Sequence, residues 1–266
     1  MSHVLYQFSG NHLGAIEWCE PRRGETLVAD SWRVDDGQVV ALEHHLDRFR
    51  TSVAATTQLE SAPVEAFLAA VLEKIQAVGS WFPRIEAVAT PGGPTLRYRH
   101  RVAPELTSEA ILASTSQDPR AHPLVKGPDL EALLRLRSNV APLGATEAVI
   151  LDAQGAIVEG AYSSVVVWTS GSDALTIVPR STPRLPGITE QVVLDIARRE
   201  GVRVEERTLF PQDLDNATVW IMSALHGIRQ ATAWVDGPTL SRSQSLRDAW
   251  REKWRDEGQG INQLPR

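Results

Sequence analysis

Residues 148–164 read AVILDAQGAIVEGAYSS, and this stretch decides how the second half of the chain folds. Apolar residues at 148–151 and at 157–158 flank the segment DAQG at 152–155, whose Asp and Gly are typical of a tight turn. The pattern predicts a β-hairpin whose second strand ends at Glu159, just before Gly160. An apolar run at 164–169 predicts that the chain then enters another strand.

Helices and strands alternate on both sides of this hairpin. Apolar residues at spacings of three and four predict helices, whereas short runs rich in Val, Ile and Thr predict strands. In the second half we expect helices at 129–138, 188–200 and 246–254 and strands at 175–178, 202–207 and 218–222. In the first half we expect a strand at 26–34, a turn at 35–37, a returning strand at 39–42, helices at 45–57 and 64–78, and strands at 85–90, 96–102 and 110–114.

The polar segment at 117–123 contains two prolines and is typical of a connection between domains. The sequence therefore predicts an α+β domain over residues 1–116, a connection over 117–123 and a second domain over 124–266.

The composition narrows the class of function. A net charge of -6 argues against nucleic-acid binding, because proteins that bind phosphate backbones usually concentrate basic residues. The single cysteine, Cys19, permits neither an intrachain disulfide nor a thiolate metal cluster, so we expect a cytoplasmic protein without a metal site. No signal-like start and no apolar run of membrane-spanning length occurs, which favours small-molecule chemistry away from membranes.

Primary amines are scarce in this chain. Only three of its 27 basic residues are lysines, namely Lys74, Lys126 and Lys253. Lys126 follows the apolar segment Pro-Leu-Val and precedes a predicted helix, so partial burial would favour its neutral, reactive amine. Without the motif described below, a lysine in this position would more often be a surface lysine near a connection between domains. Lys74 and Lys253 fall on predicted helices and are weaker candidates for amine chemistry.

Five segments occur in an order that resembles a known family. They are LEHHLDRF (42–49), VKGPD (125–129), AVILDAQGAIVEGAYSS (148–164), LPGIT (185–189) and VWIMSALHGI (219–228). Over residues 24–235 the chain resembles the fold-type IV pyridoxal-phosphate enzymes, which include branched-chain and D-amino acid aminotransferases and 4-amino-4-deoxychorismate lyase. The resemblance implies a two-domain α+β fold, with a smaller N-terminal α/β domain and a larger C-terminal pseudo-barrel domain.

The resemblance also implies which residues hold pyridoxal 5'-phosphate. Lys126 matches the lysine that forms a Schiff base with the cofactor aldehyde and then moves a proton. Glu159 matches the carboxylate that keeps the pyridine ring protonated, so that the ring can withdraw electrons. The phosphate is expected at Arg48, at the helix start Gly187, Ile188 and Thr189, and at Ser223 and Ala224.

Local readings compete with several of these roles. Arg48 could be a helix-surface arginine paired with Asp47 or Glu43, and Glu159 could be an ordinary exposed side chain. His44 and His45 are expected to be packing or capping residues. The substrate is assigned, by the resemblance alone, to Arg120, Ala29, Leu225 and His226, and Arg120 could alternatively reach the cofactor phenolate oxygen.

Three functions remain open. The leading one is an aminotransferase acting on an amino acid and a 2-keto acid through Lys126. The second is 4-amino-4-deoxychorismate lyase, which yields 4-aminobenzoate and pyruvate. The third is a non-catalytic descendant that keeps the fold, suggested by Asp129 and Glu190, where the family usually has asparagine and arginine. By analogy with the family we also expect a homodimer.

Overall fold

The computed structural model describes residues 4–16, 24–115, 117–168 and 174–261. Its contacts divide the chain into two compact units. The first unit comprises residues 1–105, 125–128 and 257–266, and the second comprises residues 106–124 and 129–256. Cys19, on which the expected compartment depends, lies outside the described residues.

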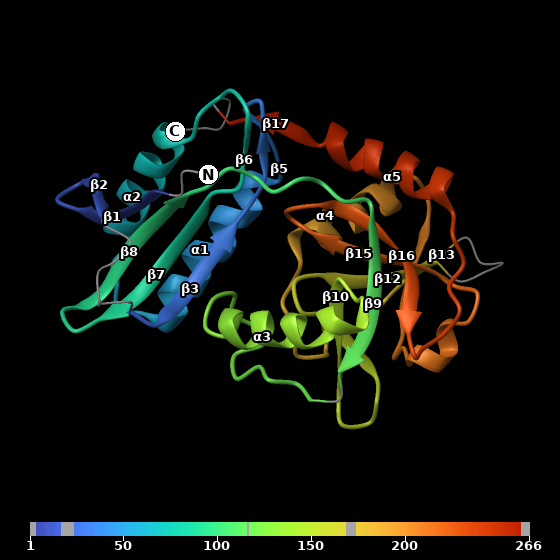
Figure 1. The fold of residues 1–266 in the computed structure, drawn as a ribbon. Helices are drawn as coiled ribbons and strands as arrows, with labels where there is room; N and C mark the ends of the chain where they lie inside the picture. The colour runs from blue at the N-terminus through green and yellow to red at the C-terminus, as the bar shows by residue number, and fades with distance from the viewer. Residues whose placement is uncertain (1–3, 17–23, 116, 169–173, 262–266) are drawn as a thin grey trace. The chain divides into compact units, whose positions relative to one another are not determined.

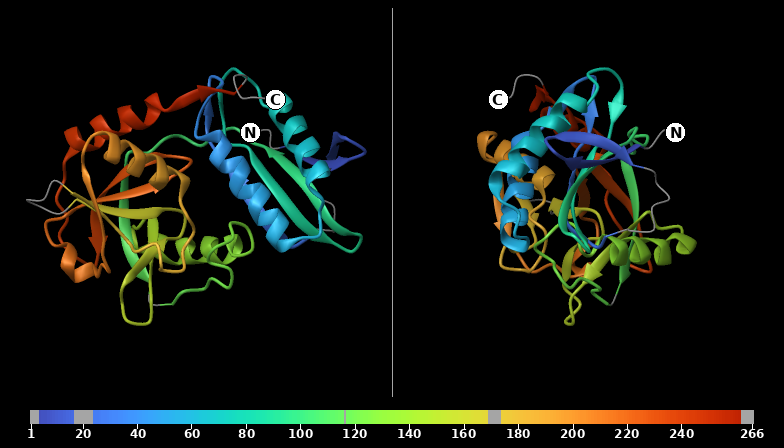
Figure 2. Two further views of the ribbon diagram at one scale, coloured as in Figure 1. Left: turned by 180° about the vertical axis from the view of Figure 1, so that it is seen from behind. Right: turned by 90° about the vertical axis from the view of Figure 1, so that its left-hand side faces the viewer.

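A five-stranded antiparallel sheet forms the frame of the first unit (Figure 1). Its strand order is β2-β1-β8-β7-β3, which places β3 at one edge. The strands are β1 (Val4–Ser9), β2 (His12–Ile16), β3 (Thr26–Ser31), β7 (Arg84–Thr90) and β8 (Gly93–His100). The helices α1 (Leu42–Thr56) and α2 (Ser61–Lys74) cover one face of this sheet (Figure 2).

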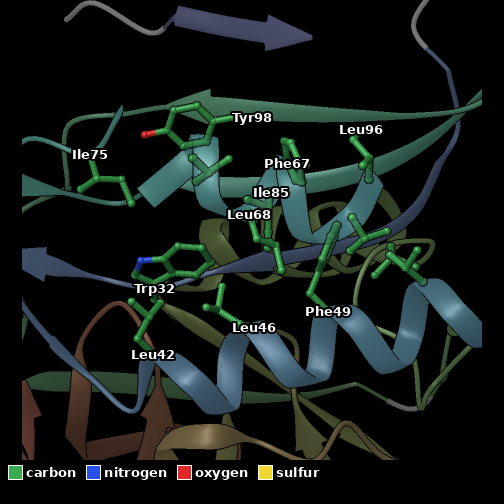
Figure 3. Close-up of a cluster of buried hydrophobic side chains, with 14 of the residues drawn as sticks. Trp32, Leu42, Leu46, Phe49, Phe67, Leu68, Ile75, Ile85, Leu96 and Tyr98 are labelled. Carbon is green, nitrogen blue, oxygen red and sulfur yellow. The ribbon is translucent and has the colours of Figure 1, made fainter. Parts of the chain in front are cut away.

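The core of the first unit lies between these helices and the sheet. Figure 3 shows Leu46 and Phe49 of α1 pointing toward Phe67 and Leu68 of α2 and toward Ile85 of β7. All five side chains are buried, and their spacing along each helix is the three- and four-residue pattern seen in the sequence. Burial of this apolar surface holds α1 against β3, and α1 and β3 carry the candidate residues of this unit.

A second, small sheet begins where β3 ends. It has the order β17-β5-β4-β6 and consists of β4 (Val34–Asp35), β5 (Gln38–Val40), β6 (Ser80–Trp81) and β17 (Gly258–Gly260). The prediction of one strand over 26–34 was therefore wrong, because the backbone leaves the large sheet at Trp32, whose indole is buried in the core. The predicted turn is confirmed, with Asp36 and Gly37 both at positive φ.

An eight-stranded sheet forms the frame of the second unit, with the order β11-β10-β9-β16-β15-β12-β13-β14. Its strands are β9 (Glu109–Thr115), β10 (Glu147–Leu151), β11 (Ile157–Gly160), β12 (Ser164–Trp168), β13 (Ala174–Ile177), β14 (Arg203–Glu206), β15 (Thr218–Ser223) and β16 (Gly227–Val235). The strand β11 lies at an edge, yet residues 161–163 connect it directly to β12, which stands sixth in the order. The sheet must curl to allow this short connection, as expected for a pseudo-barrel.

Three helices and two short 3-10 turns surround this sheet. The helices are α3 (Leu130–Val140), α4 (Ile188–Arg199) and α5 (Gln244–Asp256), and the turns are η1 (Ala141–Leu143) and η2 (Pro211–Leu214). On α5, Trp250 packs edge-on against Trp168 of β12 and lies beside Trp220 of β15, at centroid distances of 5.6 and 5.8 Å. This aromatic group fixes the tail helix to the middle of the sheet.

The sequence analysis did not predict β1, β2 or the central strand β16. Polar residues interrupt the apolar pattern of β16, and one of them, Arg229, is buried and forms an ion pair with Glu147 of β10 at 3.0 Å. An ion pair between strands distant in sequence has no local signal, so the pattern understated how buried this strand is.

The bounds of the two units differ from those expected from the sequence. The strand β9 pairs with β10 and β16, so residues 106–116 belong to the second unit. Residues 125–128 return to the first unit, as does the chain from residue 257 onward. No helix among the described residues is long and apolar enough to cross a membrane.

Candidate active site

Lys126 belongs to a short loop that is held on the edge strand β3. The backbone N–H of Ala29 donates a hydrogen bond to the Lys126 carbonyl oxygen at 2.6 Å. Gly127 has φ 144°, and a Cβ atom there would lie 2.8 Å from the backbone of Val28 and Ala29. The Lys126 side chain is partly buried, so the structure does not place it freely in solvent. The methyl group of Ala29 is 1% exposed, and its described contact is made by the backbone.

We expect the substitution Gly127→Ala to displace the Lys126 loop. The new methyl group would meet the β3 backbone, and the φ angle is one that residues other than glycine rarely adopt, at a cost of about 1–3 kcal/mol. Hydrogen exchange of the purified variant should show faster exchange at the Ala29 amide. Gly144→Ala is the matched control, because Gly144 also has positive φ but has no neighbouring atom within 4 Å of the new methyl group. Equal exchange rates at Ala29 in both variants would contradict the expectation.

A buried polar cluster lies one residue further along β3. Asp30 is fully buried and accepts hydrogen bonds from Arg48 Nε at 2.8 Å, from Arg48 Nη2 at 2.9 Å and from the His45 ring at 2.8 Å. Burial alone would raise the pKa of Asp30, but the charge of Arg48 and the hydrogen bonds from Arg48 and His45 outweigh burial and hold that pKa well below its usual value. Arg48 is therefore paired with Asp30, and it is Arg50 that pairs with Asp47 and, at 3.5 Å, with Glu43.

His45 does more than pack. Burial lowers the pKa of His45 despite the opposing charge of Asp30, and the positive charges of Arg48 and Lys126 lower it further. A neutral His45 can donate one hydrogen bond to Asp30 without adding a cation beside Lys126. His44, in contrast, is exposed on α1. One strand thus fixes the backbone of Lys126 and, through Asp30, the side chains of His45 and Arg48.

We expect Asp30→Asn to destabilise the first unit by about 3 kcal/mol, because it leaves the Arg48 cation without its buried counter-charge. Urea unfolding followed by tryptophan fluorescence measures this, since Trp32 lies beside His45. Because the pKa of Asp30 is depressed in the folded state, its contribution is complete above the unfolded value of 3.8 and is lost as the pH falls below it. Arg50→Gln, which breaks more exposed pairs on the same helix, should cost less than about 1 kcal/mol. Equal losses of unfolding free energy in the two variants would refute the view that Asp30 is the buried counter-charge of Arg48.

Glu159 ends β11 in the second unit and is held by a buried arginine. Arg120 donates from Nη1 to the Glu159 carboxylate, from Nη2 to the Pro183 carbonyl oxygen at 3.1 Å, and from Nε and Nη2 to Asp118 at 2.8 and 2.7 Å. These contacts use four of the five N–H groups of the guanidinium. Arg120 was expected to meet the substrate or the cofactor phenolate, and its described contacts are with Asp118, Glu159 and the Pro183 carbonyl oxygen.

Opposing effects act on the pKa of Glu159. Burial raises the pKa of Glu159 to about 7, although the guanidinium groups of Arg120 and Arg184 and the backbone N–H of Leu185 all favour its charged form. The local reading of Glu159 as an exposed side chain is wrong, because its residue is 7% exposed. A carboxyl group that titrates near neutral pH can share a proton with a basic nitrogen placed against it.

The start of α4 offers backbone donors for an anion. Gly187 is the residue before the helix, and no side chain caps the helix there. A Cβ atom on Gly187 would lie 2.2 Å from Ser164 Oγ, so glycine allows α4 to begin directly against the first residue of β12. The hydroxyl of Ser163 is buried and has no hydrogen-bond partner within the described part of the chain. The uncapped start of α4, with Ile188 and Thr189 both buried, fits an anion bound at a helix N-terminus. The Ser163 hydroxyl lies beside Gly160 instead.

A pocket of about 390 Å³ lies at this helix start. It is lined by Arg180, Arg184, Pro186, Gly187 and residues of α4 as far as Arg198. Of the expected phosphate contacts here, Gly187 lines the pocket, whereas Ile188 and Thr189 do not.

The turn between β15 and β16 lies beside the start of α4 and contains Ser223, Ala224, Leu225 and His226. Its position follows from pairing, because Ser164 is opposite Met222 and Ser223 is opposite Gly227. The backbone N–H of His226 donates to Ser223 Oγ at 3.3 Å, and the His226 ring accepts from the Thr107 backbone N–H at 3.2 Å. The second unit thus gathers Glu159, the α4 start and this turn at one end of its sheet.

Both departures from the family pattern have structural tasks. The Asp129 carboxylate accepts the backbone N–H groups of Ala121 and His122 at 2.9 and 2.8 Å, which orders the segment before Lys126. Glu190 forms a buried two-bond ion pair with Arg184, both contacts being 2.8 Å. These roles remove the main reason for treating the chain as a non-catalytic descendant.

The structure brings the candidate residues together in two sets. Lys126, Ala29 and Arg48 lie together in the first unit, and Glu159, Arg120, Gly187, Ile188, Thr189, Ser223, Ala224, Leu225 and His226 lie in the second. The sequence analysis missed Asp30, Asp118 and Arg184. Asp30 is the one with a usable signal in the sequence, because it is the charged residue of β3. It faces a helix on which His45 and Arg48 are three residues apart.

Comparison with known proteins agrees with this geometry. Residues 27–234 match the family model described as amino-transferase class IV. Over 249 residues the chain is 26% identical to a protein of Methanocaldococcus jannaschii provisionally named a branched-chain-amino-acid aminotransferase, covering 86% of both chains. Over 111 residues it is 30% identical to a bifunctional aminodeoxychorismate lyase and D-amino acid transaminase of Mycobacterium tuberculosis, covering 40% of this chain and 38% of that protein.

The fold has been seen in solved structures. The PLP-bound form of a hypothetical aminotransferase from Mycobacterium tuberculosis superposes with a TM-score of 0.76 at 18% identity, covering 95% of this chain and 97% of that one. The chain belongs to the class IV aminotransferase family, because the family model matches most of its length. The family and the fold class predicted from the sequence are confirmed.

Proposed function

We propose that this protein is a pyridoxal-phosphate-dependent aminotransferase that moves an amino group between an amino acid and a 2-keto acid. The observation that carries the proposal is the fixed position of Lys126 on β3, next to the Asp30 cluster, in a chain with three lysines. Membership of the class IV family supports the same reaction, and a PLP-bound neighbour supports the same cofactor.

The residues present fit the cofactor. The α4 start with no side-chain cap and the Ser223–Ala224 turn supply donors for a phosphate, and we assign Arg48 to the same phosphate. Glu159 supplies an acidic group for the ring nitrogen, and its described contacts leave it buried and fixed by Arg120. Lys126 supplies the amine to which the aldehyde is joined.

Pyridoxal phosphate supplies an aldehyde that binds amines covalently and a ring that withdraws electrons from the substrate carbon. The tasks of the protein are then electrostatic and positional. With the cofactor bound, Lys126 Nζ would accept the proton that the substrate carbon releases and would later return it. Glu159 would favour a protonated ring nitrogen, and Arg120, which also contacts Asp118, holds the Glu159 carboxylate by a hydrogen bond. A neutral His45 keeps a second positive charge away from Lys126.

A second candidate is 4-amino-4-deoxychorismate lyase, since one relative carries that name together with D-amino acid transaminase. Purified protein loaded with pyridoxal phosphate should be tested for keto-acid-dependent amino transfer, with L- and D-amino acids as donors, and for pyruvate release from aminodeoxychorismate. The proposal predicts amino transfer that depends on the keto acid. Pyruvate release alone would establish the lyase, and absence of both reactions would favour a non-catalytic role.

The proposal extends to a homodimer in the cytoplasm. The family resemblance supports the dimer, and the single cysteine of the chain supports a reducing compartment. Light scattering of the loaded protein tests the dimer, and a mass of one chain, 29.2 kDa, would contradict it.

A further inference from the structure

The tail helix α5 lies outside the part of the chain that matches the family model, which ends at residue 234. Even so, α5 reaches the β15–β16 turn. Arg251 donates hydrogen bonds from Nη1 to the carbonyl oxygens of His226 and Ile228, the first at 3.3 Å. These two carbonyl groups flank Gly227, the residue at which the chain enters β16. A single guanidinium therefore holds the C-terminal side of the turn.

Trp254 holds the same point by packing. A Cβ atom on Gly227 would lie 2.7 Å from the Trp254 ring, and Gly227 has φ 65°. The indole thus lies directly on the backbone of the turn, which only glycine permits. Trp254 is three residues after Arg251 and therefore projects from the same side of the helix.

Burying the Arg251 guanidinium costs free energy, because a cation loses its hydration. Its side chain belongs to a residue that is 7% exposed, and burial together with the charges of Arg255 and Arg247 lowers its pKa. Within the described residues Arg251 forms no ion pair, and it donates its hydrogen bonds to the two carbonyl groups. If the turn moved away, this buried cation would lose its hydrogen-bond acceptors, which is costly, so Arg251 opposes movement of the turn.

The other contacts of α5 make it a rigid support. Trp250 packs against both Trp168 and Trp220, which also contact each other. The turn is held from its other side by Thr107, which donates to the His226 ring. The β15–β16 turn is therefore held between Thr107, which precedes β9, and α5. All of these residues belong to the second unit.

We propose that Arg251 and Trp254 of α5 are positioning residues, which hold the Ser223–Gly227 turn in the conformation that binds the phosphate group. The phosphate role rests on the proposed function, whereas the clamping of the turn does not. The backbone amide groups of a turn bind an anion only when they point at it, so a loosened turn should lose phosphate affinity first. The rest of the cofactor contacts, at Lys126 and Glu159, should be unaffected.

The test compares Arg251→Gln with Lys253→Gln, a change of similar size on the same helix that does not face the turn. Hydrogen exchange of the cofactor-free proteins measures the turn directly. Dissociation constants for pyridoxal phosphate and for pyridoxal, which lacks the phosphate, measure the binding role. Arg251→Lys is the second variant, for use if Arg251→Gln fails to fold, because it keeps the charge but has a single ammonium in place of the guanidinium fork.

We expect Arg251→Gln to speed amide exchange at residues 224–228 and to weaken pyridoxal phosphate binding by about tenfold, with pyridoxal binding changed less than about twofold. Lys253→Gln should change neither. Unaltered exchange in the turn would overturn the clamp, and equal weakening of both ligands would overturn its phosphate role. Wild-type protein that binds neither ligand would refute the proposed function, and with it the role of the turn in phosphate binding. The exchange rates would still show whether Arg251 holds the turn.

Discussion

Lys126→Ala is expected to lower kcat for amino transfer by at least about 10³-fold, because the variant lacks both the amine that carries the cofactor and the base that moves the proton. The fold should survive, since the contact that fixes the loop on β3 is made by the Lys126 carbonyl oxygen and not by the side chain. Steady-state kinetics with saturating cofactor measure the loss. The urea midpoint of the cofactor-free variant should match that of the wild type.

Lys74→Ala is the matched control for this experiment. Lys74 also lies in the first unit, at the end of α2, where its ammonium sits 5.1 Å from the centre of the Tyr6 ring. Its loss should remove a cation–π contact of roughly 0.5–1 kcal/mol and leave kcat nearly unchanged. If Lys74→Ala lost as much activity as Lys126→Ala, or if Lys126→Ala stayed active, the role given to Lys126 would be wrong.

Glu159→Gln is expected to lower kcat by about 10²-fold, which is the scale for removing one preorganised electrostatic group from an active site. Glutamine has the same shape but cannot hold a proton on the ring nitrogen. Binding of the cofactor should weaken far less than kcat falls, because the phosphate and Lys126 contacts remain. Parallel measurement of kcat and of the cofactor dissociation constant separates these effects.

The pH dependence of stability gives Glu159 a second test that needs no cofactor. The folded state binds the Glu159 proton more tightly than the unfolded chain does, since burial raises its pKa from 4.5 to about 7. Its contribution to the free energy of unfolding is therefore complete below pH 4.5 and is lost as the pH rises through 7. Glu159→Gln cannot titrate, so its stability should fall less over this range than that of the wild type. Identical pH profiles would contradict the raised pKa.

Much of the fold could be predicted because its signals are local. The helices α1, α2 and α4 carry apolar residues at helical spacing, and the β10–β11 hairpin has its turn residues in order. The strand β16 could not be predicted, because its burial depends on Arg229 meeting Glu147 across the sheet. The end of β3 was also missed, since a buried Trp32 looks the same in a continuing strand as in a chain that leaves the sheet.

Some of the candidate site residues could likewise be predicted from local sequence, and others could not. Lys126, Glu159 and Gly187 lie in segments whose order along the chain could be compared with a family, so their candidacy needed no structure. Their partners could not be found in this way. Asp30 pairs with Arg48, and Arg120 donates a hydrogen bond to Glu159. Both contacts depend on which side chains meet in the folded protein, and local sequence does not show this. The support that α5 gives to the β15–β16 turn joins residues far apart in the sequence and has no pattern of its own.

Reduction with borohydride tests the central claim most directly. Protein incubated with pyridoxal phosphate and then reduced should carry one stable pyridoxyl group, and peptide mass mapping should find it on Lys126 with Lys74 and Lys253 unmodified. A protein that stays unlabelled at Lys126, or that carries label equally on all three lysines, would contradict the account.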